Sequence, residues 1–401
     1  MWRDSTSQGI RSGRRFVVIG NPGSPRIGLF DAALDRQGHP PAVLIPWLDW
    51  IEGRSHLSDI LRRGDVLRIE SPGRHFGTER AILACGSESA EADDCAFLSP
   101  AQVSALGFDK GRILCPRQWY LGFRLLLNRL KRELDELGMG SELVLMNDCD
   151  EIALMFDKPA CHRAMTAAGI PVPSSLGQPS CYGELVTRMT EMDHLRVFVK
   201  LAHGSSGSGI VAYQTDGRRH LAWTTVETEA HSGRMQLYNT RKLQRLTSQS
   251  DIAGLIDALC KNRVHAERWI PKAGMDGMCF DLRAVVIAAA PAHVVARLST
   301  SPVTNLHLLN QRRSAAVTRH RIGEEAWSAA MRTCAAAMRI APKSLYGGID
   351  LLVTPDFKRN AVLEINAFGD QLPGVLHNGL ETYDAEIRAL AAVRVVEGAI
   401  A

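Results

Sequence analysis

The sequence has few aromatic residues, no strong charge of either sign and no long apolar run. Of its 401 residues, 6% are aromatic, 22% are charged and 45% are hydrophobic, and the formal net charge is +4. This composition is typical of an ordinary globular protein, and the length is enough for two or three domains. So small a charge argues against nucleic acid as the main partner.

Membrane-spanning and disulfide-rich classes are also excluded. The longest apolar run, Val285 to Ala296, contains a proline and a histidine and is too short to span a bilayer. The nine cysteines form no C-x-x-C pair and show no metal-ligand spacing, so we expect reduced, mostly buried thiols in a cytoplasmic protein. Residues 1–15 are polar and basic with no apolar stretch behind them, which predicts a flexible tail and not a signal peptide.

Three units follow from the order of apolar segments and turns. The first, 16–140, begins with the β-type run FVVI, a Gly/Pro/Ser turn, an amphipathic helix at about 26–36 and a second strand in AVLIPW. This is the order of a parallel α/β layer. The unit ends with a helix in QWYLGFRLLLNRLKRELDELG, whose leucines and aromatic residues fall on one stripe. The second unit spans 141–265 and the third 266–401.

A glycine-rich loop follows a strand that ends in lysine, in the segment VFVKLAHGSSGSGIV at 197–211. The loop carries no bulky side chain, so its backbone N–H groups can approach a ligand and form an anion-binding concavity. Lys200 adds a positive charge beside it. One interpretation is a flap over a polyphosphate, and the other is a plain hairpin with a glycine turn. The loop candidates are Gly204, Ser205, Ser206, Gly207, Ser208 and Gly209.

The segment GGIDLLVTPDFKRNAVLEINAFGD at 347–370 predicts a β-hairpin with acidic side chains on one face. A turn near Phe357 places Asp350 across from Glu364, and Asn366 faces the same side as Glu364. Like charges opposite each other repel, and a hard cation between them removes the repulsion. We therefore expect Mg²⁺, with Mn²⁺ as an alternative, bound by these three oxygen donors. The other interpretation is an exposed polar face of a half-buried sheet.

A second hairpin, DLRAVVIAAAPAHVVARLS at 281–299, carries arginines in place of carboxylates. With a turn near Ala290, Arg283 faces Arg297, and Asp281 lies on the same side. Two adjacent arginines predict an anion between them, such as a transferring phosphoryl group. The alternative is that one arginine pairs with Asp281 and the other lies in solvent.

Further segments offer substrate contacts. GNPGSPR at 20–26 lies between a strand and a helix, and its N–H groups and Arg26 could hold a carboxylate or phosphate, although a tight strand–helix turn is the favoured interpretation. Asp370 and His377 follow the metal hairpin and are candidates for substrate contact. PWLDW at 46–50 is interpreted as core and not as a stacking site.

Taken in order, these segments resemble the ATP-grasp superfamily over roughly residues 150 to 378. The matching pieces are Lys158 in FDKPACHRAMTAAGIPVP, the strand and glycine loop after Lys200, AERWI at 266–270, the two hairpins, and the loop STSPVTNLHLLNQRR between them. The nearest likeness is to the branch that contains glutathione synthetase and the ribosomal-protein glutamate ligases. The continuation of the last loop as LLN departs from the family pattern, which leaves the role of that loop open.

The resemblance implies a mixed α/β (α+β) fold. Two α+β subdomains would clamp ATP, preceded by an N-terminal Rossmann-like α/β domain that carries part of the acceptor site. It further implies that Lys158 and Lys200 reach the α- and β-phosphates from one sheet while the glycine loop closes as a lid. The other implied contacts are Glu267 at the hinge; the backbone of Arg268, Trp269 and Ile270 at adenine; Asp281 near the ribose; Arg297 at the γ-phosphate or acyl phosphate; and Asn305 beside the metal and phosphates. His307 in the same loop is equally explained as a structural histidine.

The implied activity is that of an ATP-dependent carboxylate–amine ligase. A substrate carboxylate attacks the γ-phosphate, and an amine then attacks the acyl phosphate. No nucleophilic side chain of the protein is required, which agrees with the lack of a Ser-His-Asp or Cys-His signature. The expected partners are small-molecule or peptide carboxylates and amines, with neither nucleic acid nor membrane and with a homodimer as one assembly. Two alternatives stay open: a kinase that phosphorylates a hydroxyl, and a non-catalytic ATP-binding regulator or scaffold.

Overall fold

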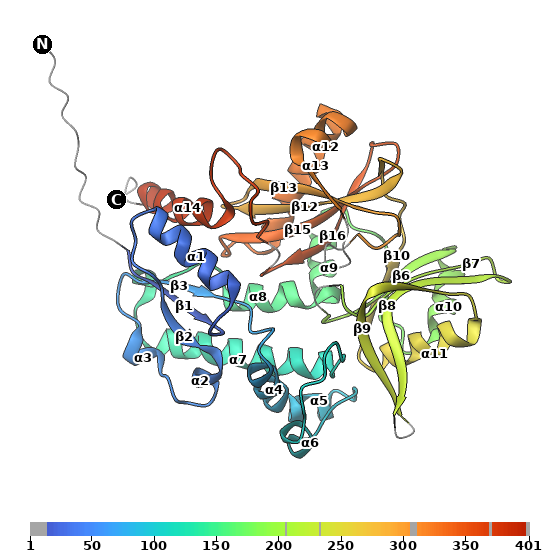
Figure 1. Cartoon of the computed structure of the whole chain (residues 1–401), viewed down its shortest axis with the longest axis horizontal. Helices are drawn as coiled ribbons and strands as arrows, with labels where there is room; N and C mark the ends of the chain where they lie inside the picture. The colour runs from blue at the N-terminus through green and yellow to red at the C-terminus, as the bar shows by residue number, and fades with distance from the viewer. Residues whose placement is uncertain (1–13, 205–206, 232–233, 305–310, 369–370, 398–401) are drawn as a thin grey trace, which may run out of the picture.

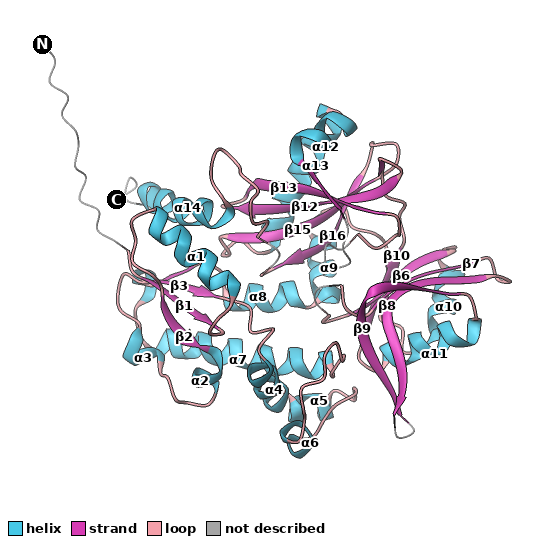
Figure 2. Cartoon of the chain, in the orientation of Figure 1, coloured by secondary structure: helices cyan, strands magenta, loops and turns pink. Residues whose placement is uncertain are grey.

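The computed structural model describes residues 14–204, 207–231, 234–304, 311–368 and 371–397. Its strands form three sheets, and Figure 1 shows the N-terminal sheet at the lower left, the C-terminal sheet above it and the central sheet at the right. Figure 2 shows that helices cover the outer faces of these sheets. Among the described residues, no helix combines the length and the apolar character that crossing a membrane requires.

The N-terminal sheet is parallel throughout, with the strand order β2-β1-β3-β4. This arrangement confirms the predicted parallel α/β layer. Its strands are β1 (Phe16–Gly20), β2 (Val43–Pro46), β3 (Val66–Ile69) and β4 (Val144–Leu145), and its helices are α1 (Pro25–Arg36), α2 (Trp47–Ile51), α3 (Leu57–Ile60), α4 (Phe76–Cys85), α5 (Ser87–Ala92), α6 (Pro100–Ser104) and α7 (Pro116–Glu136), followed by the short 3₁₀ turn η1 (Gly140–Glu142).

Helix α7 confirms the stripe that the sequence predicts, since Phe123, Leu126, Leu127, Leu130 and Leu134 are all buried. The helix also approaches α4 unusually closely at a pair of glycines. A methyl group added at Gly122 would lie 2.0 Å from the Ile82 carbonyl oxygen, and one added at Gly86 would lie 2.1 Å from that of Gln118. The two helix backbones are therefore in direct contact, which only glycine permits.

The central sheet is antiparallel, with the order β5-β10-β6-β7-β8-β9. Helices α10 and α11 cover one face, where their leucines and isoleucines join the apolar residues of the strands. The strands are β5 (Ser175–Gly177), β6 (Arg196–Leu201), β7 (Ile210–Thr215), β8 (His220–His231), β9 (Arg234–Leu246) and β10 (Val264–Arg268); the helices of this part of the chain are α8 (Cys149–Phe156), α9 (Lys158–Ala167), α10 (Tyr182–Glu191) and α11 (Gln249–Cys260).

The C-terminal sheet has the order β14-β13-β12-β15-β16, with β11 paired to β12. Alternate residues of β12 and β15 pack against α13 on one face. The strands are β11 (Gly274–Met275), β12 (Met278–Ile287), β13 (Ala290–Ser299), β14 (Gln311–Ser314), β15 (Tyr346–Val353) and β16 (Asn360–Asn366); the helices are α12 (Ala315–Ile322), α13 (Glu324–Ala337), η3 (Met338–Ile340) and α14 (Thr382–Glu397).

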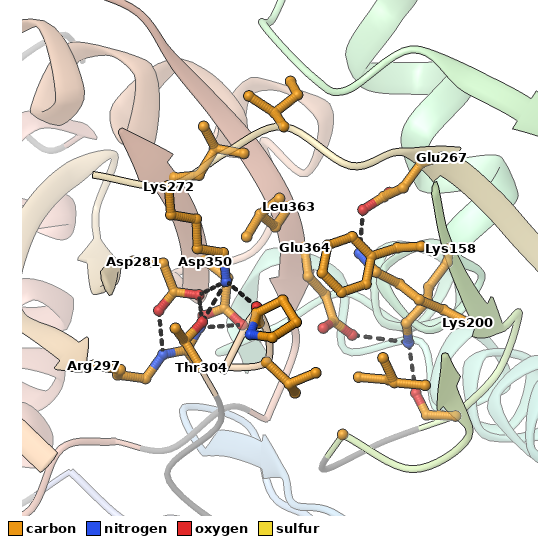
Figure 3. A pocket seen from close by; sticks show the side chains of 18 of the residues that line it. Lys158, Lys200, Glu267, Lys272, Asp281, Arg297, Thr304, Asp350, Leu363 and Glu364 are labelled. Carbon is orange, nitrogen blue, oxygen red and sulfur yellow. Dashed lines mark hydrogen bonds and ion pairs between the residues drawn. The ribbon is translucent and has the colours of Figure 1, made fainter. Parts of the chain in front are cut away.

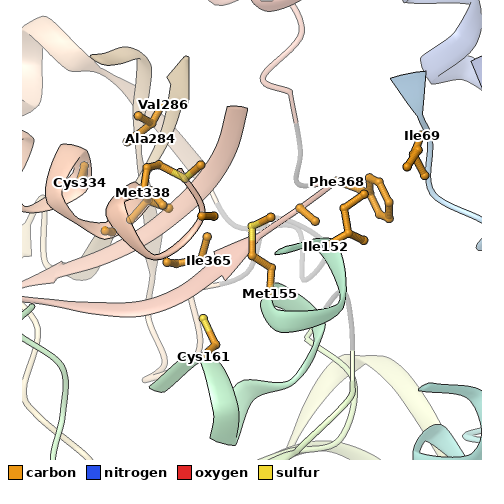
Figure 4. Close-up of a cluster of buried hydrophobic side chains, with 14 of the residues drawn as sticks. Ile69, Ile152, Met155, Cys161, Ala284, Val286, Cys334, Met338, Ile365 and Phe368 are labelled. Carbon is orange, nitrogen blue, oxygen red and sulfur yellow. The ribbon is translucent and has the colours of Figure 1, made fainter. Parts of the chain in front are cut away.

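Two strands cross the unit boundaries expected from the sequence. β4 pairs with β3 of the N-terminal sheet although it lies beyond residue 140, and β10 continues the central sheet past residue 265 to Arg268. The apolar core is likewise continuous between units. Figure 4 shows Ile69 of the N-terminal sheet, Ile152 of α8 and Ile365 of β16 in one cluster. This shared core holds β16, which carries Glu364, against the rest of the protein.

Candidate nucleotide site

A pocket of about 770 Å³, including its open mouth, lies between the central and the C-terminal sheets. Figure 3 shows Lys158, Lys200 and Glu267 on one side of it and Lys272, Asp281, Asp350 and Arg297 on the other. The lining also contains Gly204, Gly207, Ser208, Arg268, Ile270, Thr304, Leu363 and Glu364, together with the apolar side chains Phe198, Ile210, Val303 and Leu352. Most of the predicted site residues therefore meet in one place, although they come from segments up to 206 residues apart.

Lys200 lies at the end of β6 and forms an ion pair with Glu267 of β10. Burial by itself would lower the pKa of Lys200, but the neighbouring Glu267 carboxylate more than offsets this and raises it. Lys200 therefore stays charged in a nearly dry site. Glu267 is 2% exposed on an interior strand, which excludes a surface glutamate on an edge strand.

Lys158 is the first residue of α9, whose N-cap Asp157 accepts a hydrogen bond from the Ala160 N–H. The prediction that it extends from the same sheet as Lys200 is wrong, because the Asp-Lys-Pro sequence begins a helix here. The Lys158 Nζ donates to the Gly204 carbonyl oxygen at 2.5 Å and lies 2.9 Å from Glu364 Oε1. The lysine thus connects the glycine loop to the C-terminal sheet.

The glycine loop joins two antiparallel strands, since Lys200 of β6 pairs with Ile210 of β7. The strands on either side of the loop therefore form a hairpin, as one interpretation predicted. A hairpin is compatible with a flap, because Gly204, Gly207 and Ser208 line the pocket. Ser205 and Ser206 lie outside the described residues. Gly209 is not part of the lining. It has φ of 66°, and an added methyl group there would lie 2.2 Å from Leu201 Cδ1, so its role is to permit the turn.

The acidic hairpin has the predicted register, with Asp350 of β15 opposite Glu364 of β16. A bulge follows at once, because Leu351 pairs with Val362 and leaves Leu363 as the extra residue. The bulge lets the consecutive residues Leu363 and Glu364 both line the pocket. Burial acts to raise the pKa of Glu364, but the charge of Lys158 outweighs it, so the pKa is lowered and the carboxylate stays ionised.

The predicted pairing of Arg283 with Arg297 is wrong. Asp281 lies opposite Arg297, and Arg283 lies opposite Val295. The strands connect through a two-residue turn in which Ala288 and Ala289 have φ of 46° and 62°, and this shifts the register from the one expected with a turn at Ala290. Such a turn normally uses Asn or Gly, so two alanines gave no signal for it.

Both arginines nevertheless reach the acidic hairpin. The Arg297 Nε donates to Asp281 Oδ1 at 2.8 Å, and its Nη2 lies 3.1 Å from Asp350 Oδ2. Arg283 donates to the same Asp350 carboxylate through its Nε and Nη2. Neither arginine lies in solvent, because Arg283 is 7% and Arg297 is 5% exposed. Asp350 therefore sits between two guanidinium groups and is held in a fixed orientation.

The sequence analysis missed Lys272 and Thr304. The Lys272 Nζ donates to Asp281 Oδ2 at 3.1 Å and to the Pro302 carbonyl oxygen at 3.3 Å, and it also contacts Thr304 Oγ1. Burial would raise the pKa of Asp281, but Arg297 and Lys272 together lower it. Lys272 follows Glu267 by five residues, on the connection between the two sheets. Only this closeness to Glu267 in the sequence could have indicated that Lys272 belongs to the site.

The donor set at the acidic hairpin suits a hard divalent cation. Asp350 and Glu364 provide carboxylate oxygens, and the Asn366 amide keeps its oxygen free to accept because its Nδ2 donates to the Gly348 carbonyl at 3.3 Å. Within the described ranges, no group of three or more His, Cys, Asp or Glu side chains is arranged to hold a metal. Two carboxylates with further oxygens from a bound phosphate form the usual magnesium site, so these residues fit Mg²⁺.

No protein-family model and no curated protein matches this sequence. Solved structures match over nearly the whole chain. They include D-cycloserine synthetase DcsG at 14% identity and TM-score 0.53, covering 94% of this chain and 98% of that one. ATP-grasp ligase PsnB complexed with a minimal precursor matches at 14% and 0.51, covering 94% and 99%. D-alanine–D-alanine ligase from Bacillus anthracis complexed with ATP matches at 11% and 0.51, covering 96% and 99%.

The chain has the ATP-grasp fold. The pocket between two antiparallel sheets is where the resemblance expected it. At the hinge, two of the backbone N–H groups expected near adenine already have partners: the Arg268 N–H donates to the Ser174 carbonyl at 2.8 Å and the Trp269 N–H to the Arg196 carbonyl at 3.1 Å. The Trp269 ring packs on Phe198, which lines the pocket, although Trp269 itself is not part of the lining.

The remaining candidates are either outside the described residues or not part of the pocket lining. Asn305, His307 and Asp370 are outside the described residues. His377 contacts Asn378 and lies near the His293 ring, away from the pocket lining. In the strand–helix segment, the Ser24 N–H donates to the Asn21 carbonyl at 3.2 Å, which is the tight turn that the sequence allowed.

Two N-terminal features were also located. Arg26 donates to the Phe368 carbonyl and lies 3.7 Å from Glu70, so it bridges α1 and the segment that follows β16. Trp47 and Trp50 are fully buried with their rings 5.7 Å apart, which confirms that PWLDW is core.

Proposed function

We propose that the chain is an ATP-dependent carboxylate–amine ligase. It would form an amide or peptide bond through an acyl phosphate and release ADP and phosphate. One observation carries the proposal: lysines from two elements and an arginine from the facing sheet converge with the carboxylates of Asp350 and Glu364 in a single pocket beneath a glycine loop. Such an arrangement suits a polyphosphate and its metal ion, and the solved structures that share the fold include ligases crystallised with ATP or AMPPNP.

The cations of the pocket are already held in place by carboxylates. Lys200 pairs with Glu267, Lys158 with Glu364, and Arg297 with Asp281 and Asp350. On this proposal, Lys158 and Lys200 donate hydrogen bonds to the phosphates as well as to their carboxylates. This is possible because a lysine ammonium has three N–H donors. The ion pairs hold the cations in position, and little reorganisation is needed when the nucleotide binds.

Asp350, Glu364 and Asn366 would hold Mg²⁺, which when bound neutralises phosphate charge and orients the transferring group. The Asp350 carboxylate is fixed by Arg283 and Arg297, and Arg297 faces the pocket, where it offsets charge on the transferring phosphoryl group. The substrate carboxylate attacks the γ-phosphorus, ADP leaves, and the amine then displaces phosphate from the acyl phosphate. The chain contributes positioning and electrostatics, with no covalent step on a side chain.

The glycine loop would exclude water during this sequence. Its Gly204 carbonyl accepts from Lys158, and His203 immediately before it packs on Tyr120 of α7 with ring centroids 4.1 Å apart. The loop is thus anchored at its start on the N-terminal unit, and on this proposal its glycines close over the pocket. Closure protects an acyl phosphate from hydrolysis.

The structures that share this fold suggest which classes of acceptor to test first. Of the structures with the same fold, PsnB is described with a minimal precursor and D-alanine–D-alanine ligase is named for joining two D-alanine molecules. Peptides and amino acids are therefore the first acceptors to test. ADP release should be measured with ATP and Mg²⁺ against separate pools of amino acids, polyamines and peptides.

The result separates the competing activities. ADP release that needs both a carboxylate and an amine supports the ligase. ADP release with a hydroxyl acceptor and no amine would instead identify a kinase. Nucleotide binding without turnover in every pool would favour a regulator or scaffold and contradict the proposal.

A further inference from the structure

A second groove lies on the opposite face of the C-terminal sheet from the nucleotide pocket. Along β15, Asp350 and Leu352 line the nucleotide pocket, whereas Leu351 packs into the core beneath α13. The groove is formed on that second side by α13 and η3, the turn between β15 and β16, and the segment after α9. It contains about 1100 Å³ of space, part of it open to solvent, and shares no lining residue with the nucleotide pocket.

The charged side chains of this groove are all basic. Its lining contains Arg332, Arg339, Lys358 and Arg359, with the uncharged residues Gly169, Ile170, Pro171, Ala329, Thr333, Ala336 and Asn360. In the part of the chain that the structure describes, none of these four cations forms an ion pair with a carboxylate. The carboxylate on the same turn, Asp356, accepts hydrogen bonds from the Thr354 hydroxyl and the Lys358 N–H.

Helix electrostatics account for only part of this charge. Arg339 lies in the last turn of η3, where a positive charge is favourable beside the helix carbonyl groups. Arg332 lies in the body of α13, and Lys358 and Arg359 lie on a β-turn, so this effect does not explain them. Four like charges around one concavity repel each other, and an anion that bridges them would relieve the repulsion.

The spacing of the cations indicates an extended anion. Arg332 and Arg339 are seven residues apart along a helical path, which separates their backbones by about 10 Å. A single phosphate would have to draw the two side chains together, whereas an extended peptide, which rises about 3.3 Å per residue, spans this separation with three or four residues. The lining contains no aromatic side chain, and stacking on aromatic rings is the usual means of holding single-stranded nucleic acid.

The floor of the groove also contains an amide suited to a peptide. The Asn360 Oδ1 is buried and has no hydrogen-bond partner among the described residues. Rotation of this side chain would present a donor and an acceptor to a peptide backbone. A polyphosphate offers acceptors only and would leave the amide oxygen unsatisfied.

We propose that this groove binds an acidic peptide segment, with Arg332 and Arg339 on one wall and Lys358 and Arg359 on the other. The site is independent of the ligase proposal, because its binding needs neither nucleotide nor metal. It would hold a glutamate- or aspartate-rich stretch of a partner or substrate by several ion pairs. The contacts are exposed, so the affinity falls as the salt concentration rises.

The test is fluorescence anisotropy on the full chain with a labelled octapeptide of alternating glutamate and serine. We expect saturable binding that is lost when glutamine replaces glutamate in the peptide. The double variant Arg332→Gln/Arg339→Gln should weaken binding roughly tenfold. The control variant Lys110→Gln/Arg132→Gln removes the same charge from exposed positions elsewhere and should change binding less than twofold.

Three outcomes would overturn the assignment. The acidic octapeptide could fail to bind, or it could bind the groove variant as tightly as the unchanged chain. An oligothymidylate or inorganic polyphosphate of equal charge could also bind at least as tightly as the peptide at the same salt concentration. The groove variant should keep the nucleotide affinity of the unchanged chain, since Arg332 and Arg339 are on the other side of the sheet.

Discussion

The Lys158 ammonium lies 2.9 Å from the Glu364 carboxylate, across 206 residues of sequence. Lys158 begins a helix and Glu364 lies on an edge strand of the C-terminal sheet, so the contact joins two elements that only the fold brings together. On the ligase proposal, one of these residues holds a phosphate and the other a metal ion. Their pairing lowers the pKa of Glu364, which keeps that carboxylate ionised, and holds both side chains in position in the absence of a nucleotide.

Replacing Glu364 by glutamine keeps the shape of the side chain and removes its charge. We expect Glu364→Gln to reduce ADP release at least roughly 100-fold, because the charge needed to hold the metal is lost. Nucleotide affinity should change much less, since the lysines remain. The measurements are steady-state ADP release over a magnesium titration and binding of a fluorescent ATP analogue. Full activity at ordinary magnesium concentrations would contradict the metal role of Glu364.

Lys200 has two roles that a pair of variants can separate. Lys200→Met should abolish nucleotide binding and destabilise the fold by about 3 kcal/mol, because Glu267 is left buried without its partner. The double variant Lys200→Met/Glu267→Gln should recover most of that stability without recovering nucleotide binding. Urea denaturation and nucleotide titration provide the two readouts. If the double variant regained nucleotide binding as well, Lys200 would be structural and not a phosphate ligand.

His265 should make the protein acid-sensitive. Burial, together with the nearby charges of His162, Lys200 and Lys158, lowers its pKa to about 3. Between that value and its ordinary 6.5, the unfolded chain binds a proton that the folded chain excludes, so stability falls as pH decreases through this window. The loss amounts to about 2 kcal/mol between pH 6.5 and pH 5.

Urea denaturation at several pH values tests this contribution. His265→Leu should show a smaller loss of unfolding free energy between pH 6.5 and pH 5 than the unchanged chain. His320→Leu, at an exposed position on α12, serves as the control and should leave the slope unaltered. Equal slopes for His265→Leu and the unchanged chain would show that His265 does not titrate as described.

The contact between α4 and α7 should not tolerate a side chain. Gly122→Ala places a methyl group 2.0 Å from the Ile82 carbonyl oxygen, so the helices must separate. We expect a loss of about 2–3 kcal/mol of unfolding free energy. Gly254→Ala on α11 is the matched control, because an added methyl group meets nothing within 4 Å, and it should stabilise by about 0.5–1 kcal/mol. Similar effects of the two substitutions would argue against a backbone contact at Gly122.

The sequence alone allowed prediction of the elements whose geometry is local. The parallel order of β1, α1 and β2, the apolar stripe of α7 and the opposition of Asp350 and Glu364 all depend on period and turn signals within about 20 residues. The same signals failed at the hairpin of β12 and β13. There, Ala288 and Ala289 adopt positive φ, although neither is the glycine or asparagine that would have predicted the turn. Arg297 therefore lies opposite Asp281 and not opposite Arg283 as expected.

Strand periodicity was enough to predict that Asp350 and Glu364 share one face, because charged groups are costly to bury in mostly apolar strands. Lys158 and Glu267 came from the resemblance to the ATP-grasp superfamily. Which charge pairs with which could come only from the tertiary structure. The contacts of Lys158 with Glu364 and of Lys272 with Asp281, the bulge at Leu363 and the basic groove beside α13 each depend on how separate elements pack. Those packing distances are set by the whole core, and no local pattern in the chain encodes them.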